Sequence, residues 1–257
     1  MSRFRAKDSE FYDFEYFLSL EYRYFSRAHR SRVRNLLQFV GDVKGKKVLD
    51  LGGGGGFFAH MLSKRGADVC LADFSEAAIT FAQSRFPGLK TVQISGYELE
   101  TLGEQYDLVV CFDVIEHLDK PKDILEAVKN VLVSGGRFYI ATDNAHSPLD
   151  TVRFLHLLGR IGSHLSGEGR DYNMIKRVEN YRRNVLGINY HASHVNCYGF
   201  EELRKEVESL GWQVLRFRTY HLYEDPLKKV LTLFLGPKSG THMVLECLFA
   251  EDQPNES

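Results

Sequence analysis

The stretch VLDLGGGGG, which runs from Val48 to Gly56, decides the fold of this chain. Its first half is a short apolar run typical of a buried strand, and its second half is a glycine-rich turn that leads into a helical pattern. Where a strand passes into a helix, only glycine lets a nucleotide cofactor approach the backbone closely. The stretch therefore predicts a cofactor site at the end of the first strand.

A dinucleotide-binding turn would need the spacing G-x-G-x-x-G across this region. Starting that pattern at Gly52 places Phe57 in its last position, and starting it at Gly53 places Phe58 there. The last glycine of the pattern lets helix and strand pack closely, which phenylalanine cannot do. A nicotinamide-dependent oxidoreductase is therefore disfavoured.

Short apolar runs recur along the chain, each followed by a turn signal or a helical pattern. The expected strands are Val48–Leu51, Asp68–Leu71, Thr91–Ile94, Asp107–Phe112, Phe138–Ala141, Gln213–Thr219 and Met243–Ala250. A helix is expected over Gly199–Leu210, before the last two strands. This alternation is typical of a doubly wound parallel sheet, so we expect a Rossmann-like α/β fold.

The same pattern divides the chain into four parts. Residues 1–45 carry apolar side chains at helical spacings and are expected to form an N-terminal helical lid. Residues 46–142 form the cofactor-binding core, and residues 198–257 complete its sheet. Residues 143–197 interrupt the strand rhythm for too long to be a simple connection, so we expect an inserted substrate cap there.

Composition places the chain among ordinary globular proteins. Its 257 residues are 44% hydrophobic and carry a formal net charge of -1, which gives no global attraction to nucleic acid or to an anionic membrane. No run of about 18 apolar residues could span a membrane, and the N-terminus lacks the apolar stretch of a signal peptide. The four cysteines form no CxxC pair, which favours buried free thiols. We therefore expect a cytoplasmic protein; the oligomeric state is left open.

The glycine turn fits a second pattern, an acidic residue followed by alternating glycines: Asp50, Gly52, Gly54 and Gly56. This is the first motif of the class I S-adenosylmethionine-dependent methyltransferases, which the chain resembles over Lys46–Thr142 and more loosely over Phe200–Trp212. The resemblance implies S-adenosyl-L-methionine as the cofactor, with the loop backbone facing its methionine portion. It implies that Asp50 orients the loop or binds the amino group. It also implies seven strands, mostly parallel, with an antiparallel last strand.

Asp73 ends the second expected strand, 73 − 52 = 21 positions after Gly52. An acidic side chain at this place can accept hydrogen bonds from both ribose hydroxyls of a nucleotide. A helix cap before Glu76 is the alternative, and the spacing favours ribose binding. Phe74, which follows directly, is also expected to bind the cofactor.

The resemblance is weaker after the third strand, where many relatives carry an aspartate directed at the adenine amine. This chain reads Ser95-Gly96-Tyr97-Glu98 instead. Tyr97 could stack on the base while Glu98 accepts a hydrogen bond from it. Alternatively both residues belong to the surface, and the sequence favours neither interpretation. We retain Tyr97 among the expected cofactor-binding residues.

The segment YDLVVCFDVIEHL, residues 106–118, resembles the fourth-strand motif of the small-molecule branch of this superfamily, which is similar to ubiquinone-pathway methyltransferases. The resemblance implies that Phe112 and Asp113 lie at the carboxyl edge of the sheet beside the transferable methyl group. His117 is the candidate base, with a helix-capping role as the alternative. In relatives a histidine at the place of His194 often faces the substrate pocket. Asp113, His117 and His194 are thus the expected catalytic residues.

Asp113, Glu116, His117 and His194 also resemble a metal-binding set of small-RNA 2′-O-methyltransferases and, in part, of ubiquinone-pathway O-methyltransferases. Many relatives with the same Glu-His pair need no metal, so we assign no metal ligand. Basic and aromatic residues gather over residues 22–34 and 170–183. With a net charge near zero we interpret them as solvated faces and expect no nucleic-acid partner.

The expected function is methyl transfer to a small or medium-sized metabolite, because the motifs match the small-molecule branch. O-methylation is slightly favoured over N- or C-methylation, because His117 could remove a proton from a hydroxyl. The alternatives are RNA 2′-O-methylation, which a metal ion could assist, and cofactor binding without turnover. The first of these predicts substrate binding that weakens steeply with salt.

Overall fold

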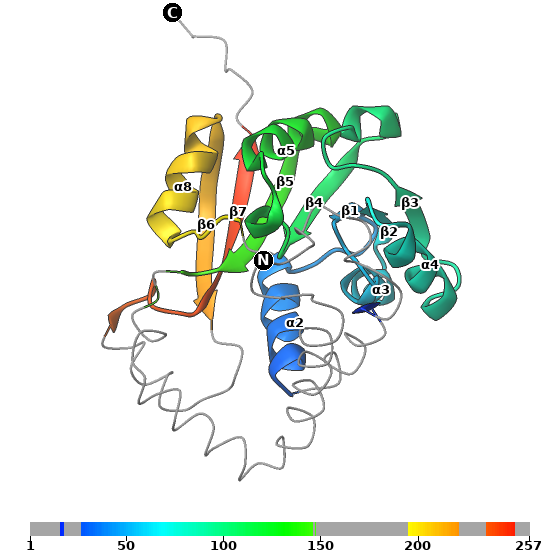
Figure 1. Ribbon diagram of the computed structural model, residues 1–257, viewed down its shortest axis with the longest axis horizontal. Coiled ribbons are helices and arrows are strands. Elements are labelled where there is room, and N and C mark those ends of the chain that lie inside the picture. Colours follow the sequence, from blue (N-terminus) through cyan, green and yellow to red (C-terminus); the bar gives the residue numbers. More distant parts are fainter. Residues whose placement is uncertain (1–15, 18–26, 146, 148–194, 221–234, 250–257) are drawn as a thin grey trace, which may run out of the picture.

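A single seven-stranded sheet forms the centre of the computed structural model, which describes residues 16–17, 27–145, 147, 195–220 and 235–249. The strand order is β3-β2-β1-β4-β5-β7-β6, and Figure 1 shows these strands following one another across the view from β6 to β3. The strands are β1 Lys47–Leu51, β2 Asp68–Asp73, β3 Lys90–Gln93, β4 Tyr106–Phe112, β5 Leu132–Asp143, β6 Trp212–Tyr220 and β7 His242–Phe249.

The pairing of the strands confirms the expected Rossmann-like fold. Strands β1 to β5 pair in parallel, whereas β7 runs antiparallel to both of its neighbours, β5 and β6. The last strand in the chain is therefore the antiparallel one. The order reverses between β1 and β4, which leaves a crevice outside the carboxyl ends of these strands in folds of this kind.

Helices cover both faces of the sheet (Figure 1). One face packs against α2 Arg27–Val40, α3 Phe57–Lys64 and α4 Glu76–Arg85. The other packs against α5 Pro121–Ala127 and α8 Phe200–Ser209, with the short 3₁₀ turns η2 Leu99–Leu102, η3 Ile115–His117 and η4 Val128–Val131. These two apolar layers make up most of the core.

The helices begin where local chemistry predicts. The Ser75 hydroxyl accepts a hydrogen bond from the Ala78 amide at 3.2 Å and caps α4. Pro121 occupies the first turn of α5, where its missing N–H costs nothing. At the start of α8 the Gly199 amide donates to Glu202 at 2.8 Å. Helix α8 therefore starts one residue after the expected start at Gly199.

Helix α2 is fixed to the sheet through its apolar face and through its last turn. Leu36, Leu37 and Val40 are buried, as the helical spacing predicts. The helix has no basic residue in its last turn, and Arg216 of β6 supplies one from outside. Its guanidinium donates to the Phe39 carbonyl at 2.6 Å and lies 4.5 Å from the Phe39 ring centroid.

Helix α2 belongs to the predicted N-terminal lid. Most of the predicted cap, residues 143–197, lies outside the described residues, so the division into four parts stays a prediction. All four cysteines are free thiols, as expected; Cys111 and Cys247 are buried, and Cys197 is exposed. In the described part of the chain, no helix combines the length and apolarity that crossing a membrane would demand.

Candidate functional site

The turn after β1 has a backbone that only glycine fits. Gly52, Gly54 and Gly56 have φ angles of 69°, 53° and 78°, in the left-handed region. A Cβ added to Gly52 would lie 2.5 Å from Cγ2 of Val114, and one added to Gly53 would lie 2.6 Å from Oδ2 of Asp50. The turn is therefore pressed against the end of β4 and against the Asp50 carboxyl group.

Asp50 carries an unsatisfied oxygen directly below this turn. The side chain is buried, and Oδ2 has no hydrogen-bond partner among the described residues. Burial, and then the negative charge of Asp73, raise the pKa of Asp50 to about 7. A buried acceptor without a partner is costly, so a site of this kind suits a ligand that brings a cationic donor, such as an ammonium group. The residues present thus fit the amino-acid arm of the expected cofactor.

Asp73 holds the glycine turn against the start of α4. Its Oδ2 accepts from the Gly54 amide and its Oδ1 from the Ser75 amide, both at 2.9 Å. Ser75, and not Asp73, is the residue that caps α4. Burial raises the pKa of Asp73. Each carboxylate oxygen can accept a second hydrogen bond, so ribose binding is compatible with these contacts and stays a prediction.

Aromatic side chains surround the same edge of the sheet. Phe74 and Tyr97, which follow β2 and β3, are 43% and 40% exposed, so each presents a ring to solvent. Phe17 is buried, and its Cε1 atom lies 3.2 Å from the position of a Cβ on Gly54. Phe17 thereby covers the glycine turn, a contact that the sequence analysis missed because nothing local marks it. Adenine stacking by Tyr97 stays a prediction.

The end of β4 carries Phe112 and Asp113 to the carboxyl edge, as expected. Phe112 packs edge-on against Phe58, with ring centroids 4.9 Å apart. Asp113 has a φ of 57°, and its amide donates to the Ala141 carbonyl at 2.9 Å. Its carboxylate forms an ion pair with Arg32 of α2. Arg32 was counted in the sequence only as part of a solvated basic face, and that interpretation is wrong for this residue.

Glu116 and His117 lie on η3, beside the ion pair. Glu116 is buried, and its Oε2 accepts from the Thr142 hydroxyl at 2.9 Å. Burial raises its pKa to about 7, which Thr142 partly opposes. Nε2 of His117 lies 4.0 Å from Oε1 of Glu116. Glu116 is therefore a second candidate for proton transfer, beside the histidine that the sequence singled out.

The chain returns from the predicted cap directly onto this turn. The Glu116 carbonyl accepts from the amides of Val195 and Asn196 at 2.8 and 3.0 Å, and the Asn196 side chain donates to the Leu118 carbonyl at 2.6 Å. His194 lies outside the described residues. Among the described residues, Val195 and Asn196 are the ones that these hydrogen bonds hold against the predicted catalytic turn.

The described members of the metal-like set do not fit a metal ion. Arg32 pairs with the Asp113 carboxylate, and the Glu116 carboxylate is turned toward Thr142. In the described ranges no three His, Cys, Asp or Glu side chains are grouped as metal ligands. The Arg32 guanidinium therefore pairs with the carboxylate that a metal ion bound between Asp113 and Glu116 would need.

A further polar cluster continues along the edge onto β5, β7 and β6. Asp143, His242 and Tyr220 are in register across these three strands. Nε2 of His242 lies 3.0 Å from Oδ1 of Asp143, its Nδ1 lies 2.8 Å from the Thr241 hydroxyl, and its ring stacks on Tyr220 with centroids 5.5 Å apart. The sequence analysis missed this cluster, whose only signal is that each residue ends or begins a strand.

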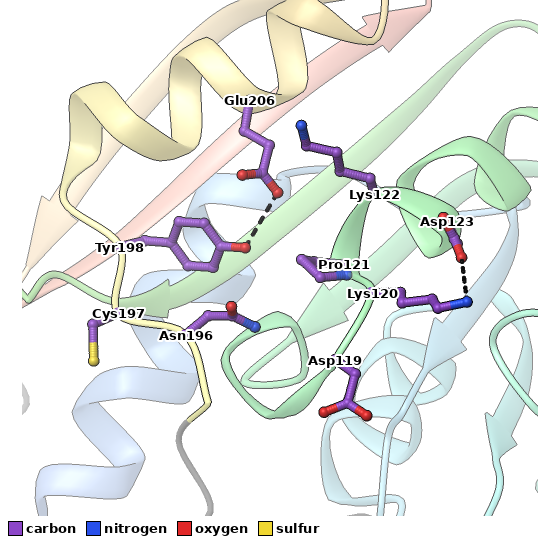
Figure 2. A pocket seen from close by; sticks show the side chains of 9 residues that line it. All are labelled: Asp119, Lys120, Pro121, Lys122, Asp123, Asn196, Cys197, Tyr198 and Glu206. Atoms are coloured by element: carbon purple, nitrogen blue, oxygen red, sulfur yellow. Dashed lines mark hydrogen bonds and ion pairs between the residues drawn. The ribbon is translucent and has the colours of Figure 1, made fainter.

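A separate cleft of about 390 Å³ lies between the η3–α5 connection and α8. Figure 2 shows its side chains, including the Tyr198 hydroxyl bonded to Glu206 at 3.2 Å and Lys120 paired with Asp123 at 3.9 Å. Its lining mixes acidic and basic groups and includes no residue of the glycine turn. We therefore place the functional site at the glycine turn and not in this cleft.

Comparison with known proteins identifies the family of the chain. A family model described as a methyltransferase domain matches residues 22–216, more than half of the chain. The chain is 33% identical over 130 residues to the ubiquinone biosynthesis O-methyltransferase of Acinetobacter baylyi, which covers 48% of this chain and 55% of that protein. It is 34% identical over 132 residues to the enzyme of the same name from Idiomarina loihiensis, covering 47% and 54%. The chain thus spans about half the length of these curated relatives.

Solved structures share the fold. An S-adenosylmethionine-dependent methyltransferase from Archaeoglobus fulgidus aligns with a TM-score of 0.58 at 16% identity, covering 91% of this chain and 99% of that one. Magnesium protoporphyrin IX methyltransferase from Synechocystis, with bound S-adenosylhomocysteine, aligns with a TM-score of 0.53 at 16% identity, covering 87% and 84%. The family model, the relatives and the fold agree, and the chain belongs to the methyltransferase domain family of class I S-adenosylmethionine-dependent proteins.

Proposed function

We propose that this protein transfers a methyl group from S-adenosyl-L-methionine to an oxygen atom of a small or medium-sized metabolite. The observation that carries the proposal is the buried Asp50 oxygen beneath the left-handed glycine turn, which has no hydrogen-bond partner in the described part of the chain and fits the cationic amino group of this cofactor. The two curated relatives named above are O-methyltransferases of ubiquinone biosynthesis, and their names support oxygen as the acceptor atom.

The residues take the following parts in the proposal. Asp50 and the backbone of the glycine turn bind the amino-acid arm, Asp73 binds the ribose, and Phe74 and Tyr97 flank the base. The bound cofactor supplies an electrophilic methyl group on a sulfonium. Binding at the carboxyl ends of β1 and β2 leaves the edge from β4 to β6 for the acceptor.

Most of the rate enhancement is expected to come from positioning, because methyl transfer needs the acceptor oxygen in line with the methyl carbon. A base is needed only when the acceptor hydroxyl must lose its proton. His117 and Glu116 stand together at that edge, and either can take the proton. Asp113 is held by Arg32 and acts in this scheme by shaping the end of β4.

Binding of S-adenosylhomocysteine, measured by calorimetry, tests the cofactor half of the proposal. We expect Asp73→Asn to weaken binding at least tenfold, because one ribose acceptor is lost and the turn is held less well. Glu76→Gln, three residues away and exposed on α4, is the control and should bind normally. Thermal melting of both variants checks the fold.

Two outcomes would count against these assignments. Unchanged affinity in Asp73→Asn would remove Asp73 from the ribose site. A wild-type protein without affinity for S-adenosylmethionine or its demethylated product would overturn the proposed function as a whole. Transfer of the tritium-labelled methyl group to oxygen, and not to nitrogen or carbon, of an accepted substrate tests the acceptor half.

A further inference from the structure

Arg32 brings a positive charge to the acidic edge at the end of β4. Its side chain is 12% exposed, and its guanidinium forms a hydrogen-bonded ion pair with the Asp113 carboxylate. Taking a charged pair out of water costs about as much free energy as the pairing returns, so such a pair is weak evidence for a role in stability. The reason for this pair therefore has to be sought in the chemistry of the edge.

Helix α2 fixes the position from which this charge enters. Arg32, Leu36 and Val40 are spaced by four residues and so share one face of the helix. Leu36 and Val40 are buried in the apolar layer that covers the sheet, and the Phe39 carbonyl in the last turn is bound by Arg216. The guanidinium is therefore delivered to the edge by a packed helix.

The backbone at Asp113 presents its carboxylate to that guanidinium. Asp113 has a φ of 57°, and among the described residues it is the single non-glycine residue with a positive φ. Its amide donates to the Ala141 carbonyl at 2.9 Å, so this left-handed conformation is fixed at the point where β4 ends. The carboxylate is 36% exposed, which leaves it open to ions from solution on the side that Arg32 does not cover.

Other groups that attract a cation lie within one turn of this carboxylate. Asp113 precedes Glu116 by three residues and His117 by four, and Nε2 of His117 lies 4.0 Å from Oε1 of Glu116. Carboxylate and imidazole groups are the side chains that bind Mn²⁺ and related divalent ions. Without a compensating cation, the two carboxyl groups would repel each other when both are ionised. The turn therefore requires a positive charge beside it.

The charge of Arg32 also acts beyond its partner. Burial raises the pKa of Glu116 to about 7, and the hydrogen bond from Thr142 and the Arg32 charge oppose that rise. Burial raises the pKa of Tyr220 as well, and the Arg32 charge again opposes the rise. Arg32 is thus the local cation for η3 and for the end of β6, in addition to the end of β4.

We propose that Arg32 is a built-in cation that takes the place of a divalent metal ion at the acceptor edge. This inference rests on the proposed function, in which this edge binds the methyl acceptor. A guanidinium keeps its charge at every working pH and needs no ion from solution. It cannot accept an electron pair from an acceptor oxygen as a metal ion does, so a proton that the acceptor loses passes to Glu116 or His117 alone.

Binding of Mn²⁺ to the chelator-treated full chain tests the proposal, because electron paramagnetic resonance measures the free ion directly. We expect no saturable binding to the wild type, since Arg32 already holds the Asp113 carboxylate. Arg32→Met keeps most of the side-chain length and removes the charge, and it should bind Mn²⁺ at least about tenfold more tightly. Mn²⁺ should then raise the melting temperature of this variant and leave that of the wild type unchanged.

Further variants serve as controls. Adding Asp113→Asn to Arg32→Met should abolish the gained binding, because the freed carboxylate is the proposed ligand. Arg32→Lys keeps the positive charge and should bind Mn²⁺ more weakly than Arg32→Met. Arg204→Met is the matched control, because it breaks an ion pair of 2.8 Å with Glu208 on the exposed side of α8 and should gain no Mn²⁺ binding. Arg32→Gln repeats the test without the charge if Arg32→Met does not fold.

Three results would overturn the proposal. In the first, the wild type binds Mn²⁺ and Asp113→Asn loses that binding, so the ion displaces Arg32. In the second, folded Arg32→Met or Arg32→Gln binds no more Mn²⁺ than the wild type, so Arg32 does not keep the ion out. In the third, Arg204→Met gains the same binding, so only the total charge matters. Failure of the wild type to bind S-adenosylhomocysteine would instead overturn the proposed methyltransferase function, whatever the Mn²⁺ results are.

Discussion

Gly52 is constrained both by its backbone and by its neighbour. Its φ of 69° lies in the region that costs other residues about 1–2 kcal/mol, and a Cβ would stand 2.5 Å from Cγ2 of Val114. Val114 directly follows Asp113, so an added methyl group that displaces Val114 would also disturb Asp113 at the end of β4, where the acceptor is proposed to bind. The crowding at Gly52 therefore links the cofactor turn to the end of β4.

We expect Gly52→Ala to destabilise the protein and to abolish binding of S-adenosylhomocysteine. The clash adds about 1–3 kcal/mol to the backbone cost, because Val114 has to move. Gly103→Ala is the control, since Gly103 has a similar φ of 64° and no atom within 4 Å of an added Cβ. Urea unfolding gives the two stabilities. Equal losses in both variants would show that backbone strain alone, without crowding, accounts for the effect.

The attachment of α2 to the sheet depends on a side chain that is distant in sequence. Arg216 lies 177 residues from Phe39, whose carbonyl it binds, and its guanidinium also pairs with Glu246 of β7. Arg218 lies over the same Phe39 ring at 5.6 Å. Helix α2 carries Arg32, so the stability of its last turn bears on the acceptor edge.

Replacing Arg216 with methionine is expected to loosen α2. The lost charged hydrogen bond at the helix end is worth about 1.5–3 kcal/mol, and Glu246 keeps its contact with Arg137, at 3.4 Å. Hydrogen exchange at the α2 amides should accelerate, while S-adenosylhomocysteine still binds. The α2 amides should exchange more slowly in the Arg218→Met variant than in the Arg216→Met variant. Equal exchange rates in the two variants would contradict the role of the Phe39 carbonyl.

Local patterns predicted the elements well and the contacts between them poorly. The apolar runs located all seven strands, although β5 begins at Leu132, six residues before the expected start, because the exposed Ser134 and Gly135 interrupt the apolar run. The cofactor turn followed from the spacing of Asp50 and its glycines. The Arg32–Asp113 pair joins residues 81 apart, and no spacing rule marks such a contact. The place of Tyr220 in the cluster with His242 could not be predicted either, because a tyrosine at the end of a strand is common and no local pattern shows that it is buried.

For the molecule as a whole, the raised pKa of Asp50 makes both stability and ligand binding depend on pH. Stability falls as the pH rises, whereas ligand affinity increases. Its pKa is 3.8 when unfolded and about 7 when folded. Between these values the folded state keeps a proton that the unfolded state has released, so stability falls as the pH rises and levels off above about 7. The full effect of such a difference is about 4 kcal/mol at most. A cationic ligand group at Asp50 favours the ionised carboxylate, so affinity should rise over the same window.

Urea unfolding and calorimetry between pH 5 and pH 8 measure both halves of this linkage. We expect Asp50→Asn to remove most of the pH dependence of stability, because the amide does not titrate, and to be more stable than the wild type at pH 8. The same variant should bind S-adenosylhomocysteine weakly at every pH, whereas the wild type should gain affinity as the pH increases. Parallel stability profiles would mean that Asp50 is ionised in the free protein. A cation such as the cofactor amino group would then have no proton to displace there, and the pH dependence of binding would have to come from other groups at the edge.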